Sequence, residues 1–149
     1  VVGAKAASGM RAVQGPGYSV QIPVSWKKRT SKNPFVVASL KTTPQWVSSD
    51  GLYLTIYDDK LAKDFKSEAA SYFAGAKVEH APTTIQDFTT AAGPAKMVTV
   101  AFPAKKRTQL LFFIKNGAKT EYAEFDAPTA TYTKNFSLYK NVIKTIQLG

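Results

Sequence analysis

Residues 108–125 read TQLLFFIKNGAKTEYAEF, two strand-like runs joined by an Asn-Gly pair. Asn-Gly favours the tight turn of a β-hairpin, because both turn residues there adopt a positive φ. The stretch therefore predicts antiparallel strands at 108–114 and 119–125. Directly after it, apolar residues recur at steps of three and four over 131–146, the period of an amphipathic helix. A hairpin followed by a helix that covers it indicates a domain containing both α and β structure.

The rest of the chain continues this pattern upstream of the hairpin. Alternating or β-branched runs predict strands at 18–22, 35–42, 52–57, 83–89 and 96–102. Residues 61–76 switch to a helical stripe, and 27–34, 44–50 and 103–107 have the composition of loops. Short connections between consecutive strands imply antiparallel pairing. We therefore expect an α+β fold, a single antiparallel β-sheet flanked by helices in an α-β-α sandwich.

The length of 149 residues suits one domain with one core. Residues 1–17 hold four glycines, no acidic residue and few large apolar side chains, so we expect a flexible N-terminal arm there. The single domain is then expected to occupy 18–149. Because the first residue is Val1 and not Met, we expect the chain to have been processed or trimmed.

Composition excludes several classes of function. The sequence has no cysteine, which removes disulfides, thiol catalysis, zinc ribbons and iron–sulfur clusters. Its one histidine leaves little for a multi-histidine metal site. The longest apolar run, 110–114, is far shorter than the roughly 18 residues of a membrane span.

The charge is strongly basic and unevenly distributed. Lys and Arg number 20 against 10 acidic residues, and residues 1–49 contain no acid at all. Two clusters stand out, Lys27-Lys28-Arg29 with Lys32, and Lys105-Lys106-Arg107. Such an excess attracts acidic partners, whether nucleic acid, an anionic membrane surface or an acidic protein face. Scattered lysines would serve solubility alone, whereas these tight clusters favour a docking surface.

No motif in the sequence predicts catalysis. His80 lies in a polar segment typical of an exposed loop, and neighbouring Asp58 and Asp59 would point to opposite faces of a strand. That pair is better placed to cap the helix that follows. Glu79, His80 and Asp87 match no metal-ligand spacing. We therefore expect neither an enzyme nor a metal site.

Aromatic residues give little support to nucleic-acid binding. Single-stranded nucleic acids are bound by exposed aromatic platforms interleaved with basic residues. Trp26 and Trp46 are the candidate platforms, but Trp26 follows a strand and its proline directly, a place typical of a core residue. The basic clusters fall in predicted loops and not among the aromatics. We expect no nucleic-acid partner.

Several stretches resemble PsbP-type domains. They are GYSVQIPVSW at 17–26, GLYLTIY at 51–57, KNG at 115–117 and the final helix with Phe136, Tyr139, Ile143 and Ile146. The resemblance spans about residues 15–149. That family includes the extrinsic oxygen-evolving subunit of photosystem II in the thylakoid lumen. The same α-β-α fold occurs in envelope lipoproteins of the DcrB type and in a Ran-binding nuclear import factor.

The resemblance implies a non-enzymatic extrinsic subunit that docks on the lumenal face of photosystem II. Its partners would be the photosystem II core and other extrinsic subunits. The protein would lie in the chloroplast thylakoid lumen, peripheral to the membrane. It would stabilise the oxygen-evolving centre and help retain the calcium and chloride of the manganese cluster, with no cofactor of its own. The implied partner-binding residues are Lys5 and Arg11 in the arm, and Lys27, Lys28, Arg29, Lys32, Lys105, Lys106 and Arg107 in the clusters.

The chain also departs from the plant subunit. It is more basic and its connections are shorter, and His80 matches no functional histidine of the family. A divergent algal subunit or a PsbP-like photosystem assembly factor would accommodate these differences. A bacterial periplasmic or envelope lipoprotein of the same fold is the further alternative, with its lipidated cysteine upstream of Val1. The N-terminus of the precursor distinguishes these alternatives.

Overall fold

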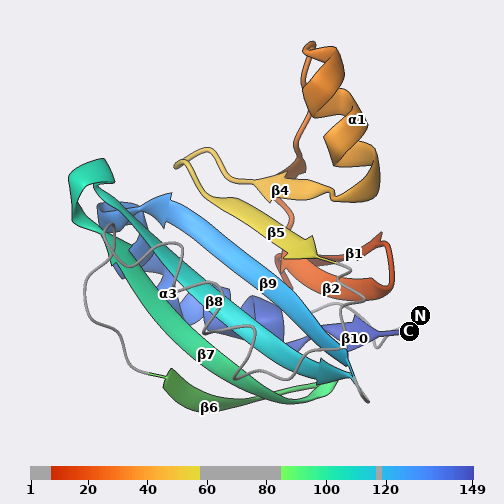
Figure 1. Cartoon of the computed structure of the whole chain (residues 1–149), viewed down its shortest axis with the longest axis vertical. Coiled ribbons are helices and arrows are strands. Elements are labelled where there is room, and N and C mark those ends of the chain that lie inside the picture. The colour runs from red at the N-terminus through yellow and green to blue at the C-terminus, as the bar shows by residue number, and fades with distance from the viewer. Residues whose placement is uncertain (1–7, 58–84, 117–118) are drawn as a thin grey trace.

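The computed structural model of the chain describes residues 8–57, 85–116 and 119–149 (Figure 1). The elements, in chain order, are β1 (Met10–Gly15), β2 (Tyr18–Pro23), β3 (Lys27–Lys28), α1 (Pro34–Thr42), β4 (Gln45–Val47), β5 (Tyr53–Tyr57), β6 (Ile85–Thr90), β7 (Gly93–Phe102), the 3₁₀ turn η1 (Pro103–Lys105), β8 (Arg107–Asn116), β9 (Lys119–Pro128), α3 (Thr129–Lys144) and β10 (Gln147–Leu148). Seven strands form one antiparallel sheet in the order β3-β4-β5-β9-β8-β7-β6. The predicted α+β class with an antiparallel sheet is therefore confirmed.

The predicted hairpin forms the centre of this sheet. Strands β8 and β9 pair along their whole length, from Arg107 opposite Pro128 to Asn116 opposite Lys119. Alternate apolar residues of both strands lie in the core with α3, namely Leu110, Phe112 and Ile114 of β8 and Ala123, Phe125 and Ala127 of β9. Gly117, the second residue of the Asn-Gly turn, lies outside the described residues.

Helix α3 covers one face of the sheet, as the helical period of 131–146 predicted (Figure 1). It buries Tyr139, Val142 and Ile143. The Tyr139 ring stacks on Phe125 of β9 with 5.0 Å between ring centroids. This face of the sheet, together with α3, makes the main core.

A second sheet, β1-β2-β10, lies beside the first and corrects the expectation of a single one. Its central strand β2 contributes Val20 and Ile22 to the same core. Strand β2 is also tied to the end of α3, since the Gln21 amide donates to Thr145 Oγ1 at 2.8 Å. Alternation along 18–22 identifies a strand but not its partners, so the separate sheet could not be foreseen.

Strand β1 also corrects the flexible arm predicted for 1–17. Residues Met10–Gly15 pair in register with β2, and Val13 is buried in the core. The hairpin they form turns at Pro16-Gly17, where Gly17 has a φ of +76°. Strand pairing compensates for the scarcity of apolar residues there. Residues 1–7, and Lys5 among them, lie outside the described part of the chain.

The strand predicted at 35–42 is wrong, because this segment is helix α1. The Asn33 side chain accepts a hydrogen bond from the Phe35 amide at 2.9 Å, and Pro34 occupies the first turn. An Asn cap followed by proline is a strong helix-start signal, and it overrides the strand preference of Val36 and Val37.

The loop predicted at 44–50 is also wrong in part, since Gln45–Val47 form strand β4. Trp46 lies opposite Leu54 of β5 and is buried, with its indole Nε1 donating to the Tyr18 hydroxyl at 3.2 Å. Trp26 is buried as well and packs edge-on against Tyr139. Both tryptophans are therefore core residues, as was expected for Trp26.

The remaining strand predictions are confirmed where they can be compared. The strands expected at 52–57 and 96–102 are β5 and β7, and the one expected at 83–89 is β6 from Ile85 onward. The helix predicted at 61–76 and the Asp58-Asp59 cap lie outside the described residues.

Candidate docking surface

The sheet face opposite α3, called the far face below, combines an apolar half with a polar half. On β7 and β8 it carries buried Val98, Val100 and Leu111. On β5 and β9 the residues that point the same way are polar, with Tyr53 opposite Asp126 and Thr55 opposite Glu124. Two of the predicted site residues, Arg29 and Arg107, contact the polar half at Tyr53.

The two basic clusters converge on one aromatic ring of this polar half. The guanidinium carbon of Arg29 lies 5.3 Å from the centroid of the Tyr53 ring, and that of Arg107 lies 5.9 Å from the same centroid. The clusters are some eighty positions apart in the chain, but β4, β5, β9 and β8 lie in succession between them in the sheet. The fold thus joins them into one surface.

Arg29 is held in place by β4. Its backbone amide donates to the Gln45 carbonyl at 2.7 Å, and its Nη1 donates to the Gln45 side-chain oxygen at 2.6 Å. Gln45 in turn donates from Nε2 to Thr55 Oγ1 at 2.9 Å. Because no carboxylate takes part in these contacts, Arg29 keeps its positive charge available to a partner.

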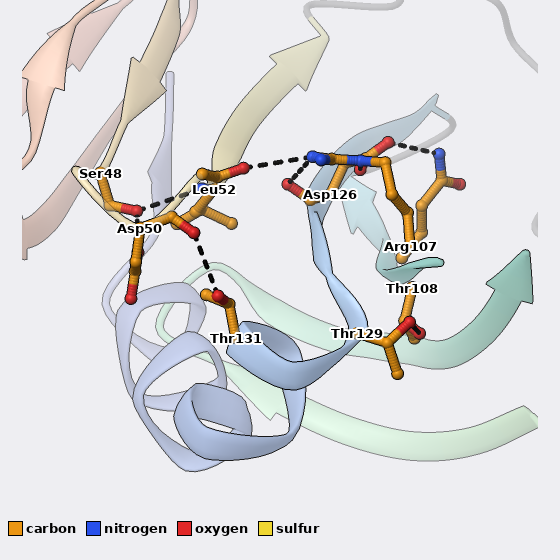
Figure 2. A network of polar contacts seen from close by, with 10 residues as sticks. Ser48, Asp50, Leu52, Arg107, Thr108, Asp126, Thr129 and Thr131 are labelled. Carbon is orange, nitrogen blue, oxygen red and sulfur yellow. Dashed lines mark hydrogen bonds and ion pairs between the residues drawn. The ribbon is translucent and has the colours of Figure 1, made fainter. Parts of the chain in front are cut away.

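Arg107, by contrast, links strand β9 to the loop before β5 through hydrogen bonds (Figure 2). Its Nε donates to Asp126 Oδ1 at 2.6 Å, and its Nη2 donates to the Gly51 carbonyl at 3.1 Å. The second carboxylate oxygen of Asp126 accepts from Gln109 Nε2 at 2.9 Å. The ion pair offsets the charge of Arg107, so this residue anchors the surface and contributes little net charge to it.

The loop between β4 and β5 is locked by the same network (Figure 2). The Ser48 hydroxyl donates to the Asp50 carboxylate and accepts from the Leu52 amide at 3.1 Å. The Asp50 carbonyl accepts from the Thr131 hydroxyl at 3.0 Å, at the start of α3. Together with the Arg107 contact to Gly51, these bonds fix the loop that lies between the two clusters.

The exposed charges of the surface are lysines. Lys27 and Lys28 form the edge strand β3, and Lys32 lies in the turn before α1. Lys105 and Lys106 occupy the turn between β7 and β8, where Lys106 has the left-handed φ of 53°. All five side chains are exposed. We call these lysines and Arg29 the basic surface.

Arg11, the other described residue of the predicted set, lies elsewhere. Its Nη2 donates to the Trp26 carbonyl at 2.6 Å, and its guanidinium carbon lies 5.9 Å from the centroid of the Trp46 ring. These contacts hold β1 against the core. Arg11 therefore belongs to a paired strand and not to a flexible arm, and its role in partner binding stays a prediction.

A carboxylate beside the basic surface is shielded from water. Burial raises the pKa of Glu124, and repulsion from Asp126 adds to this, while a hydrogen bond from the Tyr122 hydroxyl at 3.1 Å acts the other way. Burial also raises the pKa of Tyr57, and the Glu124 charge adds to that rise. Glu124 and Tyr57 therefore interact electrostatically on the far face.

A hollow of about 340 Å³ lies between α1 and the edge of the sheet. Its walls come from α1 and from β4 and β5, and they are lined by Arg29, Phe35, Val36, Ser39, Leu40, Thr43, Gln45, Thr55 and Tyr57. No nucleophile–base pair lines it. The sequence analysis did not foresee this hollow, because it took 35–42 for a strand.

The residues considered for metal binding do not assemble a site in the described part of the chain. Asp87 is exposed on β6 and forms an ion pair with Lys96. Within residues 8–57, 85–116 and 119–149, no group of three or more His, Asp or Glu side chains is close enough to hold a metal ion. Glu79 and His80 lie outside those ranges.

Tyr53 and Asp126 are the site residues that sequence reasoning missed. The alternation of 52–57 drew attention to Leu52, Leu54 and Ile56, which are buried. The same alternation places Tyr53 on the opposite face, where it remains 37% exposed. This aromatic on the solvent side of a predicted strand was the available signal.

Comparisons with known proteins bear on the fold. No protein-family model matches the sequence, and no curated protein is significantly similar to it. In the described part of the chain, neither helix has the length and apolar character to cross a membrane. The solution structure of cyanobacterial PsbP (CyanoP) from Synechocystis sp. PCC 6803 superposes with a TM-score of 0.57 and 10% sequence identity, covering 100% of this chain and 98% of that one. The chain has a PsbP-like fold.

Proposed function

We propose that this protein is a non-enzymatic extrinsic subunit that docks on the lumenal face of photosystem II. In this role it stabilises the oxygen-evolving centre and the retention of its calcium and chloride. The observation that carries the proposal is the convergence of two basic clusters on Tyr53. The PsbP-like fold supports the choice of partner, because a solved structure similar to this chain is a cyanobacterial PsbP.

The physical basis of docking is long-range attraction followed by close ion pairs. Lys27, Lys28, Lys32, Lys105 and Lys106 are exposed, and the chain has a formal net charge of +10. Such charges raise the association rate with an acidic face and make the affinity fall with salt, since the screening length is about 10 Å at 0.1 M. The photosystem II core and other extrinsic subunits present the proposed acidic faces in the thylakoid lumen.

Binding to photosystem II membranes stripped of extrinsic proteins tests the proposal. In one variant, Lys27, Lys28, Lys105 and Lys106 are all changed to Gln. We expect binding at low salt to weaken at least about fourfold, because each of the four exposed ion pairs contributes about 0.2–1 kcal/mol. Oxygen evolution should fall with the bound fraction and be restored by added calcium and chloride.

A matched control changes Lys115, Lys134, Lys140 and Lys144 to Gln, which removes the same charge from the end of β8 and from α3. We expect this variant to bind nearly as well as the unchanged chain. Equal weakening in both variants would contradict a localised surface. Failure of the unchanged chain to bind would reject photosystem II as the partner. Release from native membranes only by detergent would instead favour the envelope lipoprotein.

A further inference from the structure

Helix α1 is apolar but takes no part in the core. Its nine residues include Phe35, Val36, Val37 and Leu40, and none of the nine is buried. Phe35 is 87% exposed, the highest value among the large apolar side chains of the described residues, and Val37 is 37% exposed. A helix of this length is marginal in water by itself, so its stability has to come from contacts outside its own backbone.

Basic residues flank this apolar helix on both sides. Lys32 precedes it, Lys41 lies in its last turn, and both are exposed. Lys27 and Lys28 lie in strand β3, which precedes α1 in the chain. Residues 1–49 contain no acidic residue, so no carboxylate of this segment offsets these charges. The occupant of this surface must therefore combine apolar material with negative charge.

The shape of the region indicates how an occupant reaches it. Figure 1 shows α1 standing out at one end of the molecule, away from the centre of the sheet. The hollow of about 340 Å³ lies behind it, between α1 and strands β4 and β5. Helix α1 is therefore a convex projection, and Phe35 borders the hollow while its side chain remains 87% exposed.

We propose that α1 is a membrane-contact helix, in which Phe35 and Val37 enter the headgroup region of an anionic lipid bilayer. Lys32 and Lys41 then contact the lipid phosphates. Amphipathic helices at membrane surfaces place Phe or Leu in the acyl boundary and lysines among the headgroups. A fluid bilayer closes around a convex projection, whereas a folded protein partner would need a matching apolar pocket ringed by acidic residues.

This inference goes beyond docking on photosystem II and does not depend on it. The basic surface can bind an acidic protein face while α1 contacts the lipid beside it. Because lipid contact needs no protein partner, it can be measured on the purified chain alone. The two proposals therefore succeed or fail separately.

Vesicle sedimentation is the first test. The purified chain is mixed with vesicles of phosphatidylglycerol and phosphatidylcholine, and with vesicles of phosphatidylcholine alone. We expect binding to the anionic vesicles only. Phe35→Ser should weaken it about five- to tenfold, because part of a Phe burial energy is lost. The matched control is Ile85→Ser, since Ile85 is 49% exposed on β6, and we expect no change from it.

A charge variant follows the same logic. Lys32→Gln combined with Lys41→Gln should weaken binding about thirtyfold, since each lysine near an anionic surface contributes about 1 kcal/mol. Lys134→Gln combined with Lys144→Gln removes equal charge from α3 and should change binding much less. Equal losses from the two pairs would show attraction by net charge alone and overturn the assignment to α1.

Insertion itself is measured with Phe35→Trp and lipids brominated along the acyl chain. We expect the emission of the new tryptophan to shift to shorter wavelength and to be quenched, while buried Trp26 and Trp46 provide a constant background. Absence of quenching would overturn the proposal. So would a result in which Phe35→Ser weakens binding to detergent-solubilised photosystem II but leaves vesicle binding unchanged, because a protein would then cover α1.

Discussion

At the scale of single residues, Tyr53 contacts one arginine from each of the two basic clusters. The guanidinium groups of Arg29 and Arg107 repel each other. Their contacts with the Tyr53 ring and the ion pair of Arg107 with Asp126 offset that repulsion. The ring attracts both cations, with about 0.5–1 kcal/mol for each at an exposed site. The ion pair with Asp126 then offsets the charge of Arg107. The arrangement leaves Arg29 as the charged member that faces outward.

Glu124 gives a prediction about pH. Because burial raises its pKa above the ordinary 4.5, the folded state favours the protonated carboxyl. Its stabilising contribution is complete below pH 4.5 and is lost as the pH rises through the folded-state pKa. Glu124→Gln keeps an acceptor for the Tyr122 hydroxyl and removes the charge. We expect it to raise the melting temperature at pH 7 and to change it little at pH 4.

The control for this prediction is Asp87→Asn, which removes one negative charge from an exposed position on β6. Melting curves by circular dichroism at the two pH values measure both variants. A gain for Glu124→Gln that is the same at pH 4 and pH 7 would show that the burial of the charge is not its cause.

At the scale of elements, α1 shows how a helix-capping motif of two residues overrides the strand preference of the apolar residues that follow it. The run of Phe35, Val36 and Val37 suggested a strand, but the helix is started by the Asn33 cap and by Pro34. Capping acts through one hydrogen bond and two backbone angles. A prediction from hydrophobic periodicity does not take these into account.

Loss of the cap gives a prediction confined to α1. Asn33→Ala removes the acceptor of the Phe35 amide and should destabilise the helix by about 1 kcal/mol. Because α1 buries no residue, we expect amide hydrogen exchange in α1 to speed up about fivefold while the global melting temperature stays the same. Asn33→Ser, which restores a capping side chain, should exchange at nearly the original rate. A large fall in melting temperature would show that α1 is part of the cooperative core.

At the scale of the whole molecule, the sequence predicted the strands with a strong local pattern and missed what depends on distant partners. Strand β5 alternates clearly, β8 contains a continuous apolar run at 110–114, and α3 has a regular apolar stripe. The three-residue strand β4 was missed because its identity comes from pairing with β5. The meeting of Arg29 and Arg107 depends on the order of strands in the sheet, which local patterns do not contain.

The core shared by the two sheets predicts one unfolding transition. Ile22 of β2 is fully buried in the cluster that includes Phe125 and Tyr139. Ile22→Ala should lower the free energy of unfolding by about 2–5 kcal/mol. Tryptophan fluorescence and far-UV circular dichroism in urea should still give coincident curves. Val24→Ala, at a side chain that is 59% exposed, is the control and should change stability little. Separate transitions would show that the sheets fold independently.

The pairing of β2 with β10 has a consequence for the timing of folding during synthesis. Leu148 lies opposite Tyr18, and the Gly149 amide donates to the Gly17 carbonyl at 3.0 Å. The first hairpin is made early on the ribosome, but its last partner strand emerges more than a hundred residues later. Until then the apolar side of β2, with Val20 and Ile22, has neither β10 nor α3 beside it. During that interval the nascent chain offers a binding site to chaperones and stays compatible with transport in an unfolded state.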